Sequence, residues 1–159
     1  MRIIVDIADM RISGTLGDML ITYALGSCLG VTIYDPIVQV GGLLHVMLPE
    51  SSIDLEKATV NPYMFVDTGV PRLFREAYKA GAQKDRLVVK VAGCASMHAE
   101  ETDRFQIGKR NELMLRKLLW KNGVMMEATD LGGQVARTMS LEIGSGVVVL
   151  RTKNGERSI

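Results

Sequence analysis

Apolar positions in the first fifty residues fall in short runs separated by turn residues, a pattern typical of strands. β-Prone runs are found over residues 2–7, 19–25, 29–34 and 43–48. A polar stretch over residues 49–62 then leads to a helical segment that ends near residues 78–80, with Gly81 as its stop. Pro71 limits where this helix begins. Either Asp67 or Thr68 caps a helix that has Pro71 in its first turn, or a longer helix is kinked at Pro71.

The second half of the chain predicts one further long helix between strands. A short apolar strand is expected over residues 86–92, and an amphipathic helix over residues 107–121 whose apolar face includes Met114 and Leu118. Strands are expected again over residues 124–128, 135–143 and 147–152, followed by a polar, frayed tail. This order predicts an α+β (mixed α/β) fold, in which two long helices pack on a layered β-sheet sandwich, and a single domain over residues 1–159.

Composition and charge narrow the classes of partner. The chain has 159 residues, 47% of them hydrophobic, and 19 basic against 18 acidic side chains give a net charge of +1. Because these charges form no basic block, no nucleic-acid partner is expected. The N-terminus lacks the features of a signal peptide, and the apolar stretch over residues 19–34 is too short and too interrupted to span a membrane. We therefore expect a cytoplasmic protein that does not insert into membranes.

Three features could carry chemistry: the turn Gly26-Ser27-Cys28, His45 and Thr22. Gly26 allows close backbone approach, and backbone N–H groups beside the cysteine could hold a developing oxyanion. A histidine partner is needed to generate the thiolate, and His45 can reach if residues 29–34 and 43–48 pair as a hairpin. Thr22 can join only if the chain reverses near Gly26. Neither cysteine belongs to a cluster with zinc-ligand spacing, so no metal and no cofactor are expected.

Structural interpretations of the same residues stay open at this point. A lone cysteine in an apolar stretch is often an inert core thiol, and a histidine between apolar residues is often a buried structural group. Thr22 in a strand is ordinarily a β-former. His98, in a polar loop, is expected to be solvated rather than catalytic.

Longer strings resemble one known family. LGSCLGVTIYDP followed by GGLLHVMLPES resembles the opening signature of the CheD chemoreceptor glutamine deamidases, and FVDTGV, VAGCASM, QIGKRN and DLGGQVART are similar to its later blocks. The resemblance implies that Cys28 is the nucleophile, His45 its base and Thr22 the third catalytic member. It also implies receptor helices as the substrate and the CheC phosphatase as a partner. The chain departs from the family's usual residues at Cys94, Gln106 and Leu131.

Two alternatives to a deamidase are considered. The first is a regulatory module that mainly binds CheC, with weak or absent deamidation. The second is an unrelated cysteine hydrolase or protease. The presence of all three expected catalytic residues favours an enzyme. It does not exclude a protein that both catalyses deamidation and regulates by binding CheC.

Overall fold

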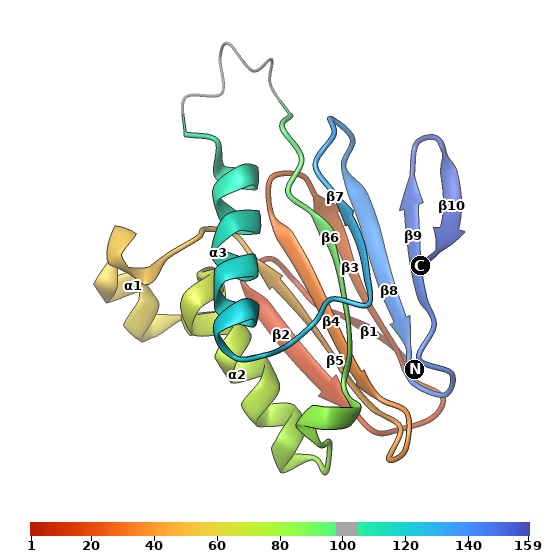
Figure 1. Cartoon of the computed structure of the whole chain (residues 1–159). Helices are drawn as coiled ribbons and strands as arrows, with labels where there is room; N and C mark the ends of the chain where they lie inside the picture. Colours follow the sequence, from red (N-terminus) through yellow and green to blue (C-terminus); the bar gives the residue numbers. More distant parts are fainter. Residues whose placement is uncertain (98–104) are drawn as a thin grey trace.

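Two mixed β-sheets and a layer of helices make up the fold (Figure 1). The computed structural model describes residues 1–97 and 105–159. The sheet that we call the outer sheet has the order β1 (Arg2–Ile4), β3 (Met19–Leu25), β8 (Arg137–Glu142), β9 (Val148–Thr152) and β10 (Gly155–Ser158). The sheet that we call the central sheet has the order β2 (Asp9–Ser13), β5 (Val40–Val46), β4 (Leu29–Asp35), β6 (Val88–Gly93) and β7 (Ala128–Leu131).

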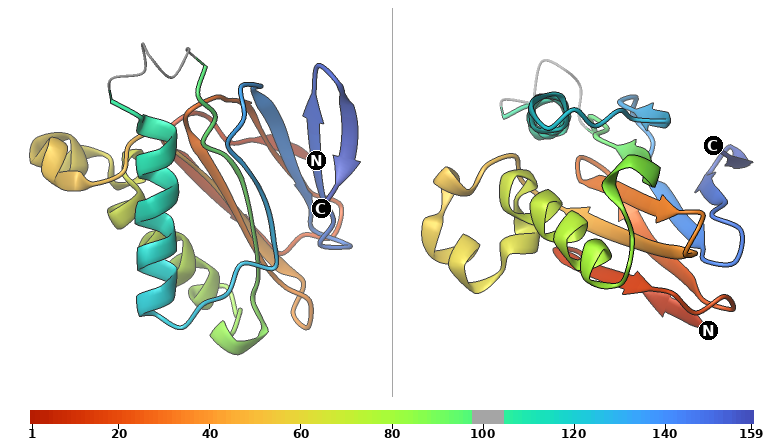
Figure 2. Two further views of the ribbon diagram at one scale, coloured as in Figure 1. Left: turned by 45° about the horizontal axis from the view of Figure 1, so that its top comes forward. Right: turned by 60° about the horizontal axis from the view of Figure 1, so that its bottom comes forward.

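Two long helices, α2 (Val66–Lys79) and α3 (Ile107–Lys121), cover the face of the central sheet that is turned away from the outer sheet, and the short helix α1 (Leu55–Val60) projects away from the sheet (Figure 2). 3₁₀ turns occupy Ser51–Ile53, Pro62–Met64 and Lys84–Arg86. The expected α+β sandwich with two long helices is therefore confirmed.

The burial pattern of each strand follows from its layer. Every residue of β4 and β5 is buried, because the central sheet has the helices on one face and the outer sheet on the other. In β8 of the outer sheet, by contrast, only alternate residues such as Met139 and Leu141 are buried. Continuous burial over residues 29–35 and 40–46 thus reflects the position of these strands in the middle layer.

Two hydrophobic cores result from this layering. Val31, Ile33 and Leu73 belong to the core between the helices and the central sheet. Leu25, Leu43 and Met139 belong to the core between the two sheets.

Several strand boundaries differ from the expectation. The strand expected over residues 124–128 is wrong: β7 begins only at Ala128, and Met125 is 87% exposed on the connection from α3. The strand β2 was not anticipated, because its sequence DMRIS has only two strongly apolar residues; it pairs with β5. The expected frayed tail is also wrong, because β10 forms an antiparallel pair with β9.

The start of α2 corrects the expected capping. The helix begins at Val66, so Pro71 lies within it, and neither Asp67 nor Thr68 is its cap. The Asp67 carboxylate instead accepts hydrogen bonds from the backbone N–H and hydroxyl of Ser51, both at 2.9 Å. Asp67 therefore fixes the 3₁₀ turn that begins at Ser51, an interaction that sequence patterns of helix capping do not predict.

Candidate active site

His45 lies in β5 of the central sheet, and Cys28 immediately precedes the neighbouring strand β4. β4 and β5 are antiparallel, and Gly30 lies directly opposite His45. Cys28 precedes Gly30 by two residues and packs against the core between the sheets, to which Leu43, two residues before His45, also belongs. Because side chains alternate along a strand, Cys28 and His45 lie on the same face as diagonal neighbours. The expected hairpin pairing is confirmed.

Thr22 reaches the histidine from the outer sheet. Its Oγ1 lies 2.7 Å from Nδ1 of His45, and both residues are fully buried. This is achieved by a reversal of the chain: β3 is bulged between Thr22 and Leu25, Ala24 has a φ of 58°, and the Gly26 N–H donates to the Ala24 carbonyl at 2.9 Å. The condition for Thr22 to approach the site is therefore met, with Ala24 rather than Gly26 in the left-handed conformation.

The hydrogen bonds around Thr22 determine which nitrogen of His45 carries the proton. The Thr22 hydroxyl donates to the Val5 carbonyl at 2.6 Å. Since a hydroxyl has one hydrogen, its oxygen must accept from Nδ1–H of His45. Nε2 is then the unprotonated nitrogen, and it is buried with no hydrogen-bond partner among the described residues. The arrangement thus presents one free basic lone pair.

Burial keeps both candidate catalytic groups neutral at neutral pH. It lowers the pKa of His45 to about 4, an effect that the charge of Asp6 partly opposes. Burial also raises the pKa of the Cys28 thiol, an effect that its own backbone N–H partly opposes. A neutral imidazole can accept a thiol proton as substrate is attacked, so the pair suits a general base and a nucleophile rather than a preformed ion pair.

The backbone carbonyls around Cys28 are all held by other segments. The Gly26 carbonyl accepts from the Ala95 N–H at 2.9 Å, and the Cys28 carbonyl from the Cys94 N–H at 2.8 Å. The N–H groups of Ser27 and Cys28 donate to no backbone carbonyl within residues 1–97 and 105–159. No backbone carbonyl of the described residues therefore competes for these two N–H groups, which are donors of the kind that an oxyanion requires.

Sequence reasoning missed two groups that support this site. The Val5 carbonyl gave no signal, because a backbone acceptor has no sequence signature. Asn111 of α3 is fully buried and donates through Nδ2 to the Ser27 carbonyl at 3.0 Å and to the Met47 carbonyl at 3.1 Å. An available signal was its place in the buried stripe of α3, which also contains Gly108 and Leu115.

The remaining sequence candidates lie around the site without entering it. Cys94 is 4% exposed, and burial raises the pKa of its thiol to about 12. Gln106 precedes α3 with a φ of 45°, a conformation that asparagine tolerates better than glutamine. Leu131 is the last residue of β7. His98 lies outside the described residues.

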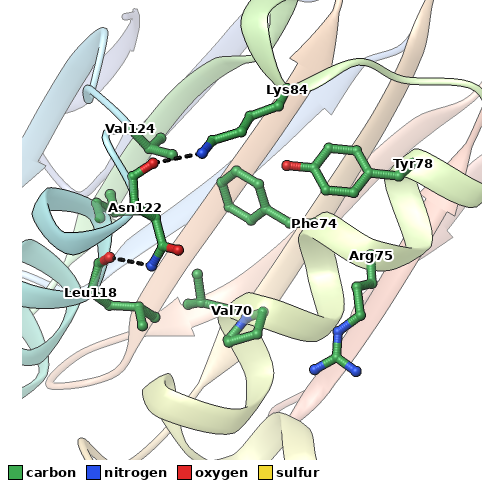
Figure 3. Close-up of a pocket in the computed structure, with 10 residues that line it drawn as sticks. Val70, Phe74, Arg75, Tyr78, Lys84, Leu118, Asn122 and Val124 are labelled. Carbon is green, nitrogen blue, oxygen red and sulfur yellow. Dashed lines mark hydrogen bonds between the residues drawn. The ribbon is translucent and has the colours of Figure 1, made fainter.

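An apolar cleft is separate from these groups. Figure 3 shows Val70 and Phe74 of α2 facing Leu118 and Val124 across the space between α2 and α3. This cleft belongs to the helical layer, whereas Cys28 and His45 face the outer sheet. The chemistry and the cleft therefore lie on opposite faces of the central sheet.

Within residues 1–97 and 105–159, no group of three or more histidine, cysteine or acidic side chains is arranged to hold a metal ion. None of the helices in this part of the chain is both long and apolar enough to cross a membrane.

Comparison with known proteins identifies the family. The model of the family described as "CheD chemotactic sensory transduction" matches residues 47–152. A Syntrophus aciditrophicus protein named "Probable chemoreceptor glutamine deamidase CheD 1" is 52% identical over 96% of this chain and 95% of its own length. The chain belongs to the CheD family. A Solibacter usitatus protein named "Probable chemoreceptor glutamine deamidase CheD" is 48% identical over 98% of this chain and 91% of its own length.

The similarity to CheD proteins includes the candidate site. The family model begins at residue 47, after Thr22, Cys28 and His45. The pairwise similarities, however, extend over 96% and 98% of this chain, which leaves too few residues unmatched for the segment from 22 to 45 to lie outside them.

Proposed function

We propose that this CheD protein is a cysteine-dependent deamidase that converts glutamine side chains of chemoreceptors to glutamate. The observation that carries the proposal is the orientation of His45. Its Nδ1 is bound to Thr22, and its Nε2, which has no hydrogen-bond partner in the part of the chain that the structure describes, is on the sheet face that Cys28 shares. The proposed substrate, a glutamine side chain of a chemoreceptor, is taken from the names of the two similar proteins.

Acylation begins when the thiol of Cys28 transfers its proton to Nε2 of His45 as sulfur attacks the carboxamide carbon. The C–S bond forms, and the oxyanion accepts hydrogen bonds from the N–H groups of Ser27 and Cys28. Gly26, immediately before them, leaves room for the turn. The C–N bond then breaks, and the amide nitrogen leaves as ammonia with the proton from His45. A thioester between Cys28 and the substrate remains.

Hydrolysis of the thioester returns the enzyme to its starting state. Nε2 of His45 takes a proton from water as the water oxygen attacks the acyl carbon. The C–S bond breaks, glutamate is released, and the sulfur recovers its proton from His45. Throughout both steps Thr22 accepts the Nδ1–H bond, so it orients the ring and stabilises the imidazolium that forms twice in each cycle.

The expected substrate is a folded receptor helix rather than a free amide. Replacing a neutral glutamine with glutamate adds a negative charge to the receptor and creates a side chain that can be methylated. The chain acts in the cytoplasm in this proposal, where the signalling part of a receptor is accessible.

A receptor assay tests the proposed activity. A purified cytoplasmic fragment of a chemoreceptor from the same genome is incubated with the protein and analysed by peptide mass spectrometry. Conversion replaces NH₂ by OH and raises the mass of one glutamine-containing peptide by about 1 Da. Cys28→Ala should abolish conversion, whereas Cys94→Ala should retain it, because the Cys94 thiol is buried and protonated. Equal conversion by wild type and Cys28→Ala would remove Cys28 from the mechanism.

CheC is the proposed protein partner, on the strength of the family resemblance. A pull-down with purified CheC tests this, and wild type and Cys28→Ala should be captured equally if binding is independent of the chemistry. Capture of CheC without any receptor conversion would favour the regulatory binding module. Absence of capture by either form would refute the CheC interaction.

A further inference from the structure

We propose that Asn111 is a positioning residue that aims the Cys28 N–H at the oxyanion by fixing the peptide bond between Ser27 and Cys28. This inference rests on the proposed deamidase function. It assigns to α3 a role in catalysis that neither the thiol nor the imidazole supplies.

The contacts of Asn111 are unusual for a buried helix residue. Its Nδ2 donates to two backbone carbonyls, those of Ser27 at 3.0 Å and Met47 at 3.1 Å. Its Oδ1 is buried and has no hydrogen-bond partner among the described residues. A buried polar atom without a partner destabilises the fold, so the side chain cannot be accounted for as apolar filling. The two N–H donations are what this position provides.

The first contact sets the direction of the Cys28 N–H. In a trans peptide, the carbonyl of one residue and the N–H of the next lie in one plane and point in opposite directions. The Ser27 carbonyl points to α3, so the Cys28 N–H points away from α3. The effect of this N–H on its own thiol, which partly offsets the rise in pKa caused by burial, is consistent with an N–H beside the sulfur. An oxyanion formed by attack of that sulfur would lie within the same region.

The second contact ties this peptide to the strand that carries the base. Met47 follows His45 by two residues, just after the end of β5. One amide group thus joins the start of β4 to the end of β5. The distance between the two strand ends is fixed where nucleophile and base must meet.

The helix itself is held firmly against the site. A Cβ atom at Gly108 would lie 2.6 Å from the Cys94 carbonyl oxygen and 2.8 Å from that of Ala95, so the first turn of α3 rests on this backbone. The N–H groups of Cys94 and Ala95 hold the carbonyls of Cys28 and Gly26. Asn111 therefore extends from a helix that packs on the same backbone segment that binds the turn Gly26-Ser27-Cys28.

The test separates oxyanion binding from thiol reactivity. Asn111→Leu retains much of the side-chain shape but removes both donors. We expect kcat for the receptor fragment to fall about 10- to 100-fold with KM within about twofold of wild type, because the lost positioning acts on the transition state. Alkylation of Cys28 by iodoacetamide forms no oxyanion, so its rate should stay within about twofold of wild type.

Two further variants make the result decisive. Asn122→Leu is the matched control: Asn122 also donates to a carbonyl, that of Leu118 at 2.8 Å, but at the far end of α3, and its kcat should be unchanged. Asn111→Asp regains one donor when its carboxyl is protonated, and full burial beside two carbonyl oxygens raises the pKa of a carboxyl at this position. Its deficit relative to wild type should therefore narrow as the pH is lowered from about 8 to about 5. If Asn111→Leu shows no cooperative thermal unfolding and is therefore not folded, the pH dependence of the kcat of Asn111→Asp tests the positioning role on its own.

Each outcome separates the inference from the function on which it rests. An unchanged kcat in Asn111→Leu, or a pH-independent deficit in Asn111→Asp, overturns the positioning role. A parallel loss of alkylation and deamidation also overturns it, because Asn111 would then act on the thiol and imidazole. If wild type itself leaves the receptor glutamine unchanged, or if Cys28→Ala converts it, the proposed function fails instead.

Discussion

The hydrogen bond between Thr22 and His45 predicts a specific loss of rate when the hydroxyl is removed. Thr22→Val preserves the branched shape of the side chain, but it leaves Nδ1–H of His45 and the Val5 carbonyl without their partner in a fully buried position. It also removes the acceptor that selects the Nδ1–H tautomer, so Nε2 is no longer reserved as the base.

The magnitude follows from the charge that develops on the ring. When His45 takes the thiol proton it becomes an imidazolium, and a hydrogen bond to a charged group contributes about 1.5–3 kcal/mol. At about 1.4 kcal/mol for each factor of ten, kcat should fall roughly 10- to 150-fold. The free energy of unfolding should also fall by about 1–3 kcal/mol, because a buried donor and acceptor are left unpaired.

The assay is conversion of the receptor fragment at saturating concentration, at a temperature well below the unfolding midpoint of each variant. Thr22→Ser is the matched control, since it retains the hydroxyl, and its kcat should stay within about threefold of wild type. A Thr22→Val protein with a kcat within twofold of wild type would refute the orienting role. Equal impairment of Thr22→Ser would assign the effect to packing instead.

Three other outcomes follow from the same geometry. The pKa of His45 is about 4 in the folded state against about 6.5 unfolded, so the unfolded state binds the proton first and stability is lost as pH falls between these values. Denaturant unfolding should show a loss of up to about 3 kcal/mol that His45→Gln lacks. Iodoacetamide should alkylate native Cys28 before Cys94, which is 4% exposed, and both equally in denaturant, as read by mass spectrometry. Gly30→Ala places a Cβ 2.8 Å from the side chains of Leu25 and Met139 and should cost about 1–3 kcal/mol in urea unfolding, whereas Gly17→Ala, with open space, should be near neutral.

The parts of the fold that sequence predicted are those governed by local patterns. The helix over residues 107–121 and the strand over residues 19–25 have the expected bounds, because each has a clear apolar period and a clear stop. The segment over residues 124–128 was misread because Val124 and Met126 pack on the helical core from a connection, as apolar residues in a strand would. In a short segment, the apolar pattern of a connection that packs on the core cannot be distinguished from that of a strand in a sheet.

The candidate site was partly predictable for a related reason. Cys28 and His45 could be paired from a hairpin, which is a local structure with few alternatives. Thr22 could not be placed, because its approach depends on a bulge in β3 and on a left-handed Ala24, a conformation that alanine seldom adopts. The role of Asn111 could not be assigned although its place in the buried stripe of α3 was a signal, because its two acceptors are backbone carbonyls 84 and 64 residues away in sequence.

The site is built across the interface between the two sheets, and this couples its chemistry to the packing of the core. Thr22 and Val5 belong to the outer-sheet side and His45 to the central sheet, so the hydrogen-bonded chain from Nδ1 to the Val5 carbonyl crosses the layer that Leu25 and Met139 fill. These two hydrogen bonds are 2.6 and 2.7 Å long, and a separation of the partners by roughly half an ångström or a marked loss of linearity would take them out of the normal range. A core substitution that shifts one sheet on the other should therefore reduce catalysis before it unfolds the protein, because the tautomer of the base depends on the spacing of the sheets.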